Sequence, residues 1–186
     1  MPPKVKTKKE DIIKAGIEII RREGEVSLNA RSIARHLDCS TQPIFSNFAT
    51  MEELQNEIIV SAHKLYMGYL ENESRTGEYP KYKSFGMAYI RFAKEEKNLF
   101  KMLFMCDRKN KEFVATNDFD ASVQLIMESN KISKEKATLM HLEMWTFVHG
   151  IASMIATSFL ELDLELISTM ISDAYSGIRK HHLERE

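Results

Sequence analysis

Apolar side chains recur along most of the chain at intervals of three and four residues, the spacing that places them on one face of an α-helix. This pattern predicts a first helix over residues 7–23, with Gly24 ending it. It predicts further helices over 27–37, 40–48, 50–70, 82–97, 98–106, 119–130, 133–162 and 164–183, with a polar loop at 72–80 and an irregular stretch at 107–117. Alternating runs typical of strands are few, so the pattern predicts an all-α fold.

Polar residues at the expected helix starts support these limits. Thr7 with Glu10, and Thr50 with Glu53, have the spacing of a capping box. Ser27, Ser40 and Ser133 are the predicted caps of three further helices, listed here in chain order.

Residues 27–54 contain the most informative arrangement, two short helices separated by only Asp38, Cys39 and Ser40. Two helices joined by a turn of three or four residues have the geometry that lets the second helix enter a DNA major groove. The spacing alone is equally compatible with an ordinary helical corner.

Composition agrees with a helical protein and adds an asymmetry of charge. The 186 residues are 44% apolar and include only 7 Gly and 4 Pro. Residues 1–50 hold nine Lys and Arg against six Asp and Glu, whereas the rest holds 17 against 21. A basic end on an acidic body fits a DNA-facing domain, although chance variation between solvated surfaces is an alternative.

Cysteine usage and targeting signals bear on location. Cys39 and Cys106 are isolated and match no metal-binding or redox spacing, as expected of reduced thiols. The basic N-terminus is not followed by the apolar stretch of a signal peptide. The weakly polar run over 144–160 is too short to span a bilayer, so we expect a soluble, cytoplasmic protein with no membrane partner.

Residues 8–59 are similar to the tetracycline-repressor (TetR) family of one-component bacterial regulators. That family has a helix ending in Gly, followed by the signature "IA..LG.S...LY..F..K..L". The corresponding residues here are Ile33, Ala34, Leu37, Asp38, Ser40, Ile44, Phe45, Phe48 and Leu54. Further on, Trp145, His149 and Gly150 resemble a Trp–His–Gly motif of one subgroup of the family's ligand-binding domains.

The resemblance implies an N-terminal three-helix helix-turn-helix domain over 1–54, whose fourth helix continues to about 70, and a larger helical ligand-binding and dimerisation domain over 55–186. It implies a homodimer that binds palindromic double-stranded operator DNA, acts most often as a repressor, and is controlled by a small-molecule effector. The DNA-binding residues that it implies are Ser27, Asn29, Arg31, Ser40, Thr41, Gln42, Pro43, Ile44, Phe45, Ser46, Asn47, Thr50 and Met51.

The chemistry of the implied recognition helix agrees with this role. Gln42 suits a bidentate contact with adenine, and Ser46 and Asn47 suit phosphates or bases. A basic arm precedes this region and either follows DNA or is a solvated tail; it consists of Lys4, Lys6, Lys8 and Lys9.

Three positions depart from the family signature. Asp38 replaces the turn Gly, Phe45 replaces a Tyr, and Met51 replaces a Lys. The last two changes remove a hydroxyl and a charge from the expected phosphate contacts. We therefore expect weaker or more salt-sensitive DNA binding than is typical of the family.

The remaining two thirds are rich in Met and aromatic residues, which can line an adaptable apolar pocket or simply form the core. The resemblance places a pocket for an apolar or aromatic ligand among the middle helices, and the residues predicted to line it are Phe104, Met105, Met144, Trp145 and His149. His141, Trp145 and His149 share one helical face. Either they form a polar end to that pocket or, in the alternative that we favour, both His are core residues.

The last two predicted helices carry more apolar surface than a monomer readily covers. Pairing them with the same helices of a second copy, as a four-helix bundle, would bury it. The predicted dimer-interface residues are Ile151, Met154, Ile155, Phe159, Ile167, Met170, Ile171, Ala174 and Ile178.

Two other functions compete with a ligand-controlled regulator. A helical enzyme is the less favoured, because none of the six His follows a Glu at the spacing of a di-metal bundle, and no phosphate-binding Gly loop is present. A TetR-like adaptor that has lost specific DNA binding is supported only by the three departures. The sequence predicts no cofactor, no metal and no catalytic residue.

Overall fold

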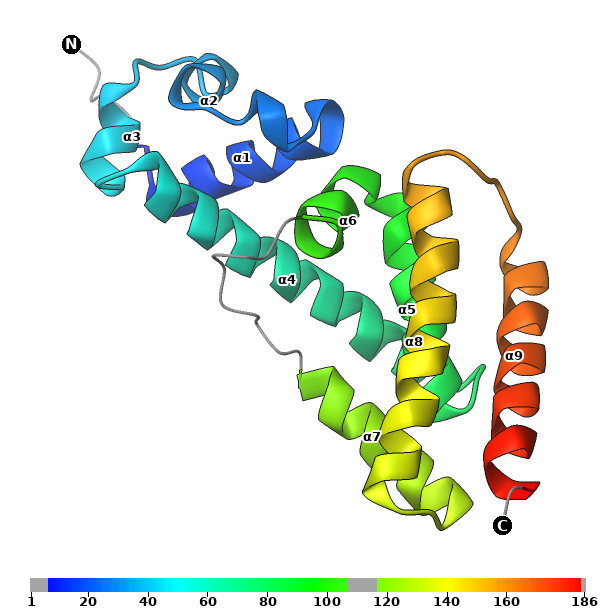
Figure 1. Ribbon diagram of the computed structural model, residues 1–186. Coiled ribbons are helices and arrows are strands. Elements are labelled where there is room, and N and C mark those ends of the chain that lie inside the picture. The colour runs from blue at the N-terminus through cyan, green and yellow to red at the C-terminus, as the bar shows by residue number, and fades with distance from the viewer. Residues whose placement is uncertain (1–6, 107–116, 185–186) are drawn as a thin grey trace. The chain divides into compact units, whose positions relative to one another are not determined.

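The computed structural model of the protein describes residues 7–106 and 117–184, and every regular element in these ranges is helical (Figure 1). This confirms the predicted all-α class. The predicted irregular stretch at 107–117 lies almost wholly outside the described residues. The elements are α1 (Lys9–Glu23), the 3₁₀ turn η1 (Glu25–Ser27), α2 (Ala30–His36), α3 (Gln42–Asn47), α4 (Met51–Thr76), α5 (Lys81–Glu95), α6 (Lys97–Phe104), α7 (Asn117–Asn130), α8 (Lys134–Ala156) and α9 (Leu164–Glu184).

The chain divides into two compact units, and α4 contributes to both. The first unit comprises residues 1–67 and 96–106, and the second comprises residues 68–95 and 107–186. The predicted domain boundary at residue 54 remains a prediction.

In the first unit, α1 packs against η1, α2, α3 and α6. Gly16 allows α1 to approach α4 closely, because a Cβ there would collide with the side chain of Ile58 unless that side chain shifted. Arg21 fastens α6 to α1 with two hydrogen bonds to the Glu96 carboxylate, of 2.8 and 2.6 Å. The fully buried apolar side chains of this unit include Ile12, Ile20, Ile33, Ile44, Phe48, Leu54, Ile58, Leu99 and Phe100.

In the second unit, α8 contacts α5, α7 and α9, and α5 contacts α7 and α9 (Figure 1). One apolar cluster joins α7 to α8 through Val123, Ile126, Ala137 and Met140, with the rings of Phe119, Tyr82 and Tyr175 packed against it. A second link is polar: Arg91 Nε of α5 donates to Glu73 Oε2 near the end of α4 at 3.0 Å, and the Glu73 side chain is 3% exposed.

Two helix ends differ from the prediction. Helix α4 continues to Thr76 rather than to about 70, because Leu70 and Glu73 are still buried there; the predicted loop at 72–80 therefore shortens to 77–80. Helix α8 ends at Ala156 rather than at 162. The chain leaves it through Ser158, whose φ of 58° is a left-handed conformation that does not continue a right-handed helix.

Candidate nucleic-acid interface

Asn29 fixes the start of α2. Its side-chain oxygen accepts hydrogen bonds from the backbone N–H groups of Arg31 at 3.1 Å and Ser32 at 3.0 Å, and Ser32 Oγ accepts from the Asn29 N–H at 3.1 Å. This reciprocal arrangement satisfies the free donors of the first turn. Ser27 is therefore not the cap that the sequence predicted: it lies in η1, where its carbonyl accepts from Ser32 Oγ at 2.8 Å.

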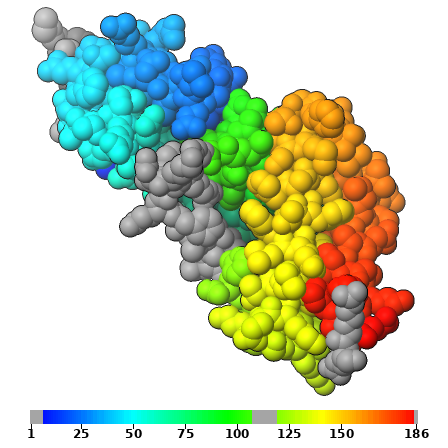
Figure 2. All heavy atoms as spheres, in the orientation of Figure 1, coloured from blue at the N-terminus to red at the C-terminus, as the bar shows by residue number. Residues whose placement is uncertain are grey.

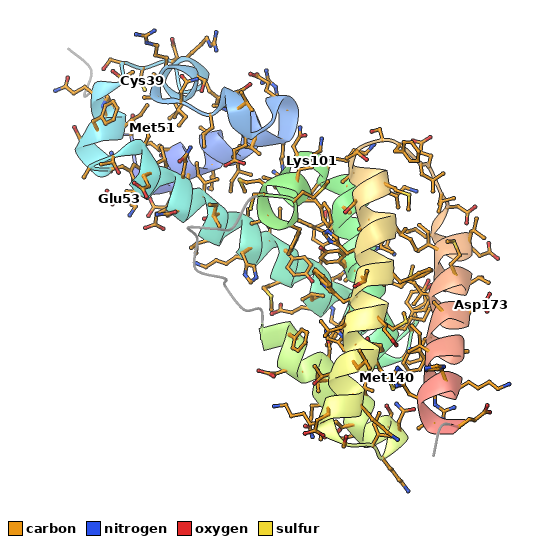
Figure 3. All side chains as sticks on the ribbon, viewed as in Figure 1. Cys39, Met51, Glu53, Lys101, Met140 and Asp173 are labelled. Carbon is orange, nitrogen blue, oxygen red and sulfur yellow. The ribbon has the colours of Figure 1, made fainter. Side chains whose placement is uncertain are left out.

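The turn between α2 and α3 accommodates a side chain at the position where the family signature has Gly. Asp38 has a φ of 50°, a left-handed conformation that Asp tolerates better than most residues. The Cys39 N–H donates to the Ala34 carbonyl at 2.9 Å, and Cys39 lies on this connection in Figure 3. The turn therefore closes without the glycine.

Helix α3 turns one face inward and the other outward. Ile44 and Phe48 are each 1% exposed, whereas Phe45 is 51% exposed, and Gln42 and Ser46 are also on the surface. Ile44 was predicted among the DNA-binding residues; this is wrong, because its side chain is buried in the core of the unit. Pro43 occupies the first turn of α3, where its missing N–H breaks no helical bond.

Two short polar side chains of α3 donate hydrogen bonds to backbone carbonyls of the protein. Asn47 Nδ2 donates to the Pro43 carbonyl at 2.7 Å and to the Thr7 carbonyl at 3.3 Å. Ser46 Oγ donates to the Gln42 carbonyl at 2.9 Å. Asn47 therefore links α3 to the residue preceding α1, and no local pattern indicates this contact because Thr7 is 40 residues away.

The start of α4 follows α3 after a short extended link. Thr50 Oγ1 accepts from the Glu53 N–H at 3.1 Å, and Glu53 Oε2 accepts from the Ala49 N–H at 2.7 Å, so the predicted Thr50 cap is confirmed. Met51 and Glu53 lie in this first turn (Figure 3). The predicted caps Thr7 and Ser40 are wrong, because α1 starts at Lys9 and α3 has Thr41 as its N-cap residue.

Positive charge is available on α2. Arg31 and Arg35 are exposed, and neither has an ion-pair partner among the described residues. Of the predicted basic arm, Lys4 and Lys6 lie outside the described residues. Lys9 belongs to α1 and its Nζ pairs with Glu57 at 2.8 Å, so it is part of the folded unit rather than of an arm.

The residues predicted to line a ligand pocket fall into both units. Phe104 and Met105 belong to the first, whereas Met144, Trp145 and His149 are on α8 of the second. The Trp145 ring is 47% exposed and stacks on the His149 ring, with centroids 5.1 Å apart and 13° between the planes. Tyr89, which the sequence analysis did not identify, bonds His149 Nδ1 at 2.8 Å.

His141 is a core residue, as the interpretation favoured from the sequence predicted. It is 8% exposed, its Nδ1 lies 3.0 Å from the hydroxyl of Tyr82, and the Phe119 ring meets its ring edge-on at 4.7 Å. Burial lowers the pKa of His141 to about 4, because the charged imidazolium is poorly solvated there.

Four of the predicted dimer-interface residues are wrong. Ile151, Ile155, Ile167 and Ile171 are at most 3% exposed in a single chain, because they form the core in which α8 and α9 meet α5. Phe159 is 80% exposed in the link after α8. The other predicted members are partly exposed, namely Met154, Met170, Ala174 and Ile178.

The first half of α8 has an exposed apolar face that was not predicted from the sequence. Leu139 is 49% exposed, Leu142 42% and Trp145 47%, and the surface of α8 is open in the view of Figure 2, where it is yellow to orange. A usable signal was present, because Glu143 is the only charged residue between Lys136 and Glu161. A helix so poor in charge on all its faces is expected to be covered on all of them.

None of the helices in the described ranges is long and apolar enough to cross a membrane. No three His, Cys, Asp or Glu side chains in those ranges are grouped so that they could hold a metal ion.

Comparison with known proteins supports the architecture. No family model and no curated protein matches the sequence. Among solved structures, a protein assigned as a transcriptional regulator of the TetR family from Vibrio parahaemolyticus is similar, with a TM-score of 0.61 over 92% of this chain and 98% of that chain. The two are 16% identical, so the likeness shows a shared fold. The all-helical fold of this protein is therefore that of a TetR family structure, as residues 8–59 predicted.

Proposed function

We propose that this protein is a DNA-binding transcriptional regulator, and that α3 is the helix that enters the major groove. The observation that carries the proposal is the division of α3 into two faces. Ile44 and Phe48 anchor it in the core, while Gln42, Phe45 and Ser46 are presented to solvent. A recognition helix needs this division, because base edges are reached only by side chains that the fold does not use.

Residues around α3 supply contacts to the DNA backbone in this proposal. Arg31 and Arg35 offer two exposed guanidinium groups on α2, the helix that crosses the backbone in this motif. Thr41 and Thr50 add hydroxyls at the starts of α3 and α4. Contacts to phosphate make affinity fall steeply with salt, so each arginine removed should lower the slope of log K against log salt by about one.

The proposed regulator is a homodimer, and the exposed face of α8 supports this. Leu139 and Leu142 together leave an exposed apolar surface on α8. Met170 and Ile178 of the neighbouring helix α9 are partly exposed as well. A twofold pairing of α8 and α9 as a four-helix bundle covers both helices. Sedimentation should show a dimer at micromolar concentration, and Leu142→Glu should yield a folded monomer.

We further propose that a small apolar or aromatic molecule controls the regulator by binding beside Trp145 and His149. The stacked pair offers a flat aromatic surface, and the Tyr89 hydroxyl holds the imidazole in place. Trp145 is the sole tryptophan of the chain, so its fluorescence reports on this position directly. A panel of aromatic compounds should include some that quench it; absence of any response at millimolar concentration would contradict ligand control here.

Selection from a pool of random duplexes tests DNA binding. The full chain is incubated with the pool at low and moderate salt, and enriched sequences are read. A palindrome should emerge, and Gln42→Ala should lose preference for it while remaining folded. The matched control is Gln124→Ala, an exposed glutamine on α7, which should bind as the wild type does. No enrichment at either salt concentration would overturn DNA binding and favour an adaptor of the same fold.

A further inference from the structure

The outward face of α3 has an unusual chemistry for a helix that reads DNA. The helix is six residues long, Gln42–Asn47, and contains no Lys or Arg. Arg and Lys are the side chains that pair with the two acceptors of guanine in the major groove, and they make the commonest specific contact. The exposed positions of α3 therefore lack the usual means of selecting a G·C pair.

Intramolecular hydrogen bonds further reduce the number of α3 side chains that can select a base. The amide donor of Asn47 is engaged by the Pro43 and Thr7 carbonyls, and the hydroxyl hydrogen of Ser46 by the Gln42 carbonyl. Thr41 is partly buried, and its hydroxyl can pair with either kind of base pair. Among the exposed side chains of α3, the amide of Gln42 and the ring of Phe45 are the groups that distinguish one base from another.

These two side chains are three residues apart and hence neighbours on one helical face. A Gln amide donates to N7 of adenine and accepts from its N6 amino group, whereas an apolar ring contacts the C5 methyl group of thymine. Phe45 is 51% exposed, although burial of an aromatic ring is favourable, so its apolar surface is available to a partner.

We infer that α3 reads A·T pairs, with Gln42 selecting an adenine and Phe45 selecting a neighbouring thymine through its methyl group. The inference rests on the proposed DNA binding and adds the specificity. Each half-site should therefore contain adjacent A·T pairs where α3 docks, and any G·C preference should be weak there.

Modified bases test both contacts one at a time. The palindrome selected by the full chain is synthesised with deoxyuridine in place of the thymine, which removes only the C5 methyl group. A second duplex carries 7-deazaadenine, which removes only the N7 acceptor. We expect affinity to fall about fourfold for loss of a buried methyl group and roughly 2- to 13-fold for loss of one of the two hydrogen bonds to adenine.

Variants assign each effect to its residue. Phe45→Ala should bind the thymine and uracil duplexes equally, whereas Phe45→Leu, which keeps an apolar side chain, should still prefer thymine. Gln42→Ala should no longer distinguish adenine from 7-deazaadenine. Ser46→Ala, a change at the adjacent exposed position, should keep both preferences. Circular dichroism of each variant establishes that it is folded.

The outcomes separate the inference from the function on which it rests. Selection of A·T pairs with both modified-base effects supports it. The inference would be overturned if the selected palindrome had G·C pairs where α3 docks, or if modified and unmodified duplexes bound equally well. Either result would leave the proposed regulatory function unaffected. Failure to enrich any sequence would overturn both.

Discussion

Polar contacts in the helix-turn-helix segment of the first unit differ from those in the helical core of the second unit. The difference lies in how many residues separate the two partners in the sequence. In residues 29–53 most of these bonds join near neighbours, such as Asn29 with Ser32 and Ala49 with Glu53, and the bond from Asn47 to the Thr7 carbonyl is the exception. In the second unit they join distant residues, as between Tyr82 and His141, 59 residues apart, and Tyr89 and His149, 60 residues apart.

The difference shows which parts of the fold tolerate change. A local cap satisfies one or two backbone groups that water also reaches, so its loss costs little. A buried polar pair between distant helices has no water to replace a lost partner, so its loss costs more. We therefore expect substitutions in the helix-turn-helix segment to lower the stability of the protein less than changes to the buried polar pairs of the second unit.

Breaking the buried ion pair of the second unit should have the largest effect. Arg91→Ala leaves Glu73, whose side chain is 3% exposed, without its cationic partner, and should lower the free energy of unfolding by about 3 kcal/mol. Urea denaturation followed by circular dichroism measures the change.

The matched change in the first unit is Arg21→Ala, which removes a guanidinium whose side chain is 40% exposed and should cost about 1 kcal/mol or less. The double variant Glu73→Leu with Arg91→Met should recover most of the stability that Arg91→Ala loses. Equal costs for Arg91→Ala and Arg21→Ala would remove the proposed distinction between the units.

Protonation of His141 should give the next largest effect. Its folded pKa of about 4 lies below the unfolded value of 6.5, so between these values only the unfolded chain binds the proton. The stabilisation is complete above pH 6.5 and is lost as the pH falls toward 4, by about 1.4 kcal/mol per pH unit. Denaturation curves at pH 7, 6 and 5 measure this slope. In His141→Gln the slope should be smaller by that amount; an unchanged slope would assign the pH dependence to other groups.

Removal of the α2 cap should have a moderate effect. Asn29→Ala takes away the acceptor of two backbone N–H groups and should destabilise the protein by about 1 kcal/mol. Ser27→Ala is the control, because the Ser27 hydroxyl makes only a 3.4 Å contact with the Glu23 carbonyl. Thermal denaturation should give a clearly lower Tm for Asn29→Ala than for Ser27→Ala. The reverse order would reinstate Ser27 as the cap.

The smallest effects should come from relieving left-handed backbone in each unit. Asp38→Gly, at a φ of 50°, should stabilise the protein by about 0.5 kcal/mol, because Asp tolerates this conformation in part. Lys131→Gly, at a φ of 55°, should stabilise by about 1 kcal/mol, since Lys lacks the short polar side chain that helps Asp. Differential scanning calorimetry resolves such shifts, and a loss of stability in either variant would show that the side chain contributes more than its strain costs.

Much of the fold was predictable because the helical period and the caps are local properties. The positions of the helices, the Thr50 and Ser133 caps and the turn at Asp38 were predicted from neighbouring residues. Of the α3 residues that were predicted to contact DNA, Ile44 is buried. Ile44 was included because the match to a family signature does not distinguish an anchoring residue from a contacting one.

The exposed apolar face of α8 was harder to predict because one helix can bury more than one side. Apolar spacing on α8 and α9 is the same for a residue facing α5 as for one facing a second chain. Ile151 and Ile155 turned out to face inward, whereas Leu139 and Leu142 remain outside. Periodicity gives the faces of a helix but not the identity of the neighbour on each.

By itself the sequence determined the helical class, the helix-turn-helix spacing and the side chains offered on α3, since each depends on residues within a few positions of one another. Only the tertiary structure decided that Asn47 is tied to Thr7, that Glu73 is paired with Arg91, and that His141 is buried against Tyr82. Those contacts join residues from 18 to 59 positions apart, and their partners are chosen by the packing of helices, which no local pattern encodes.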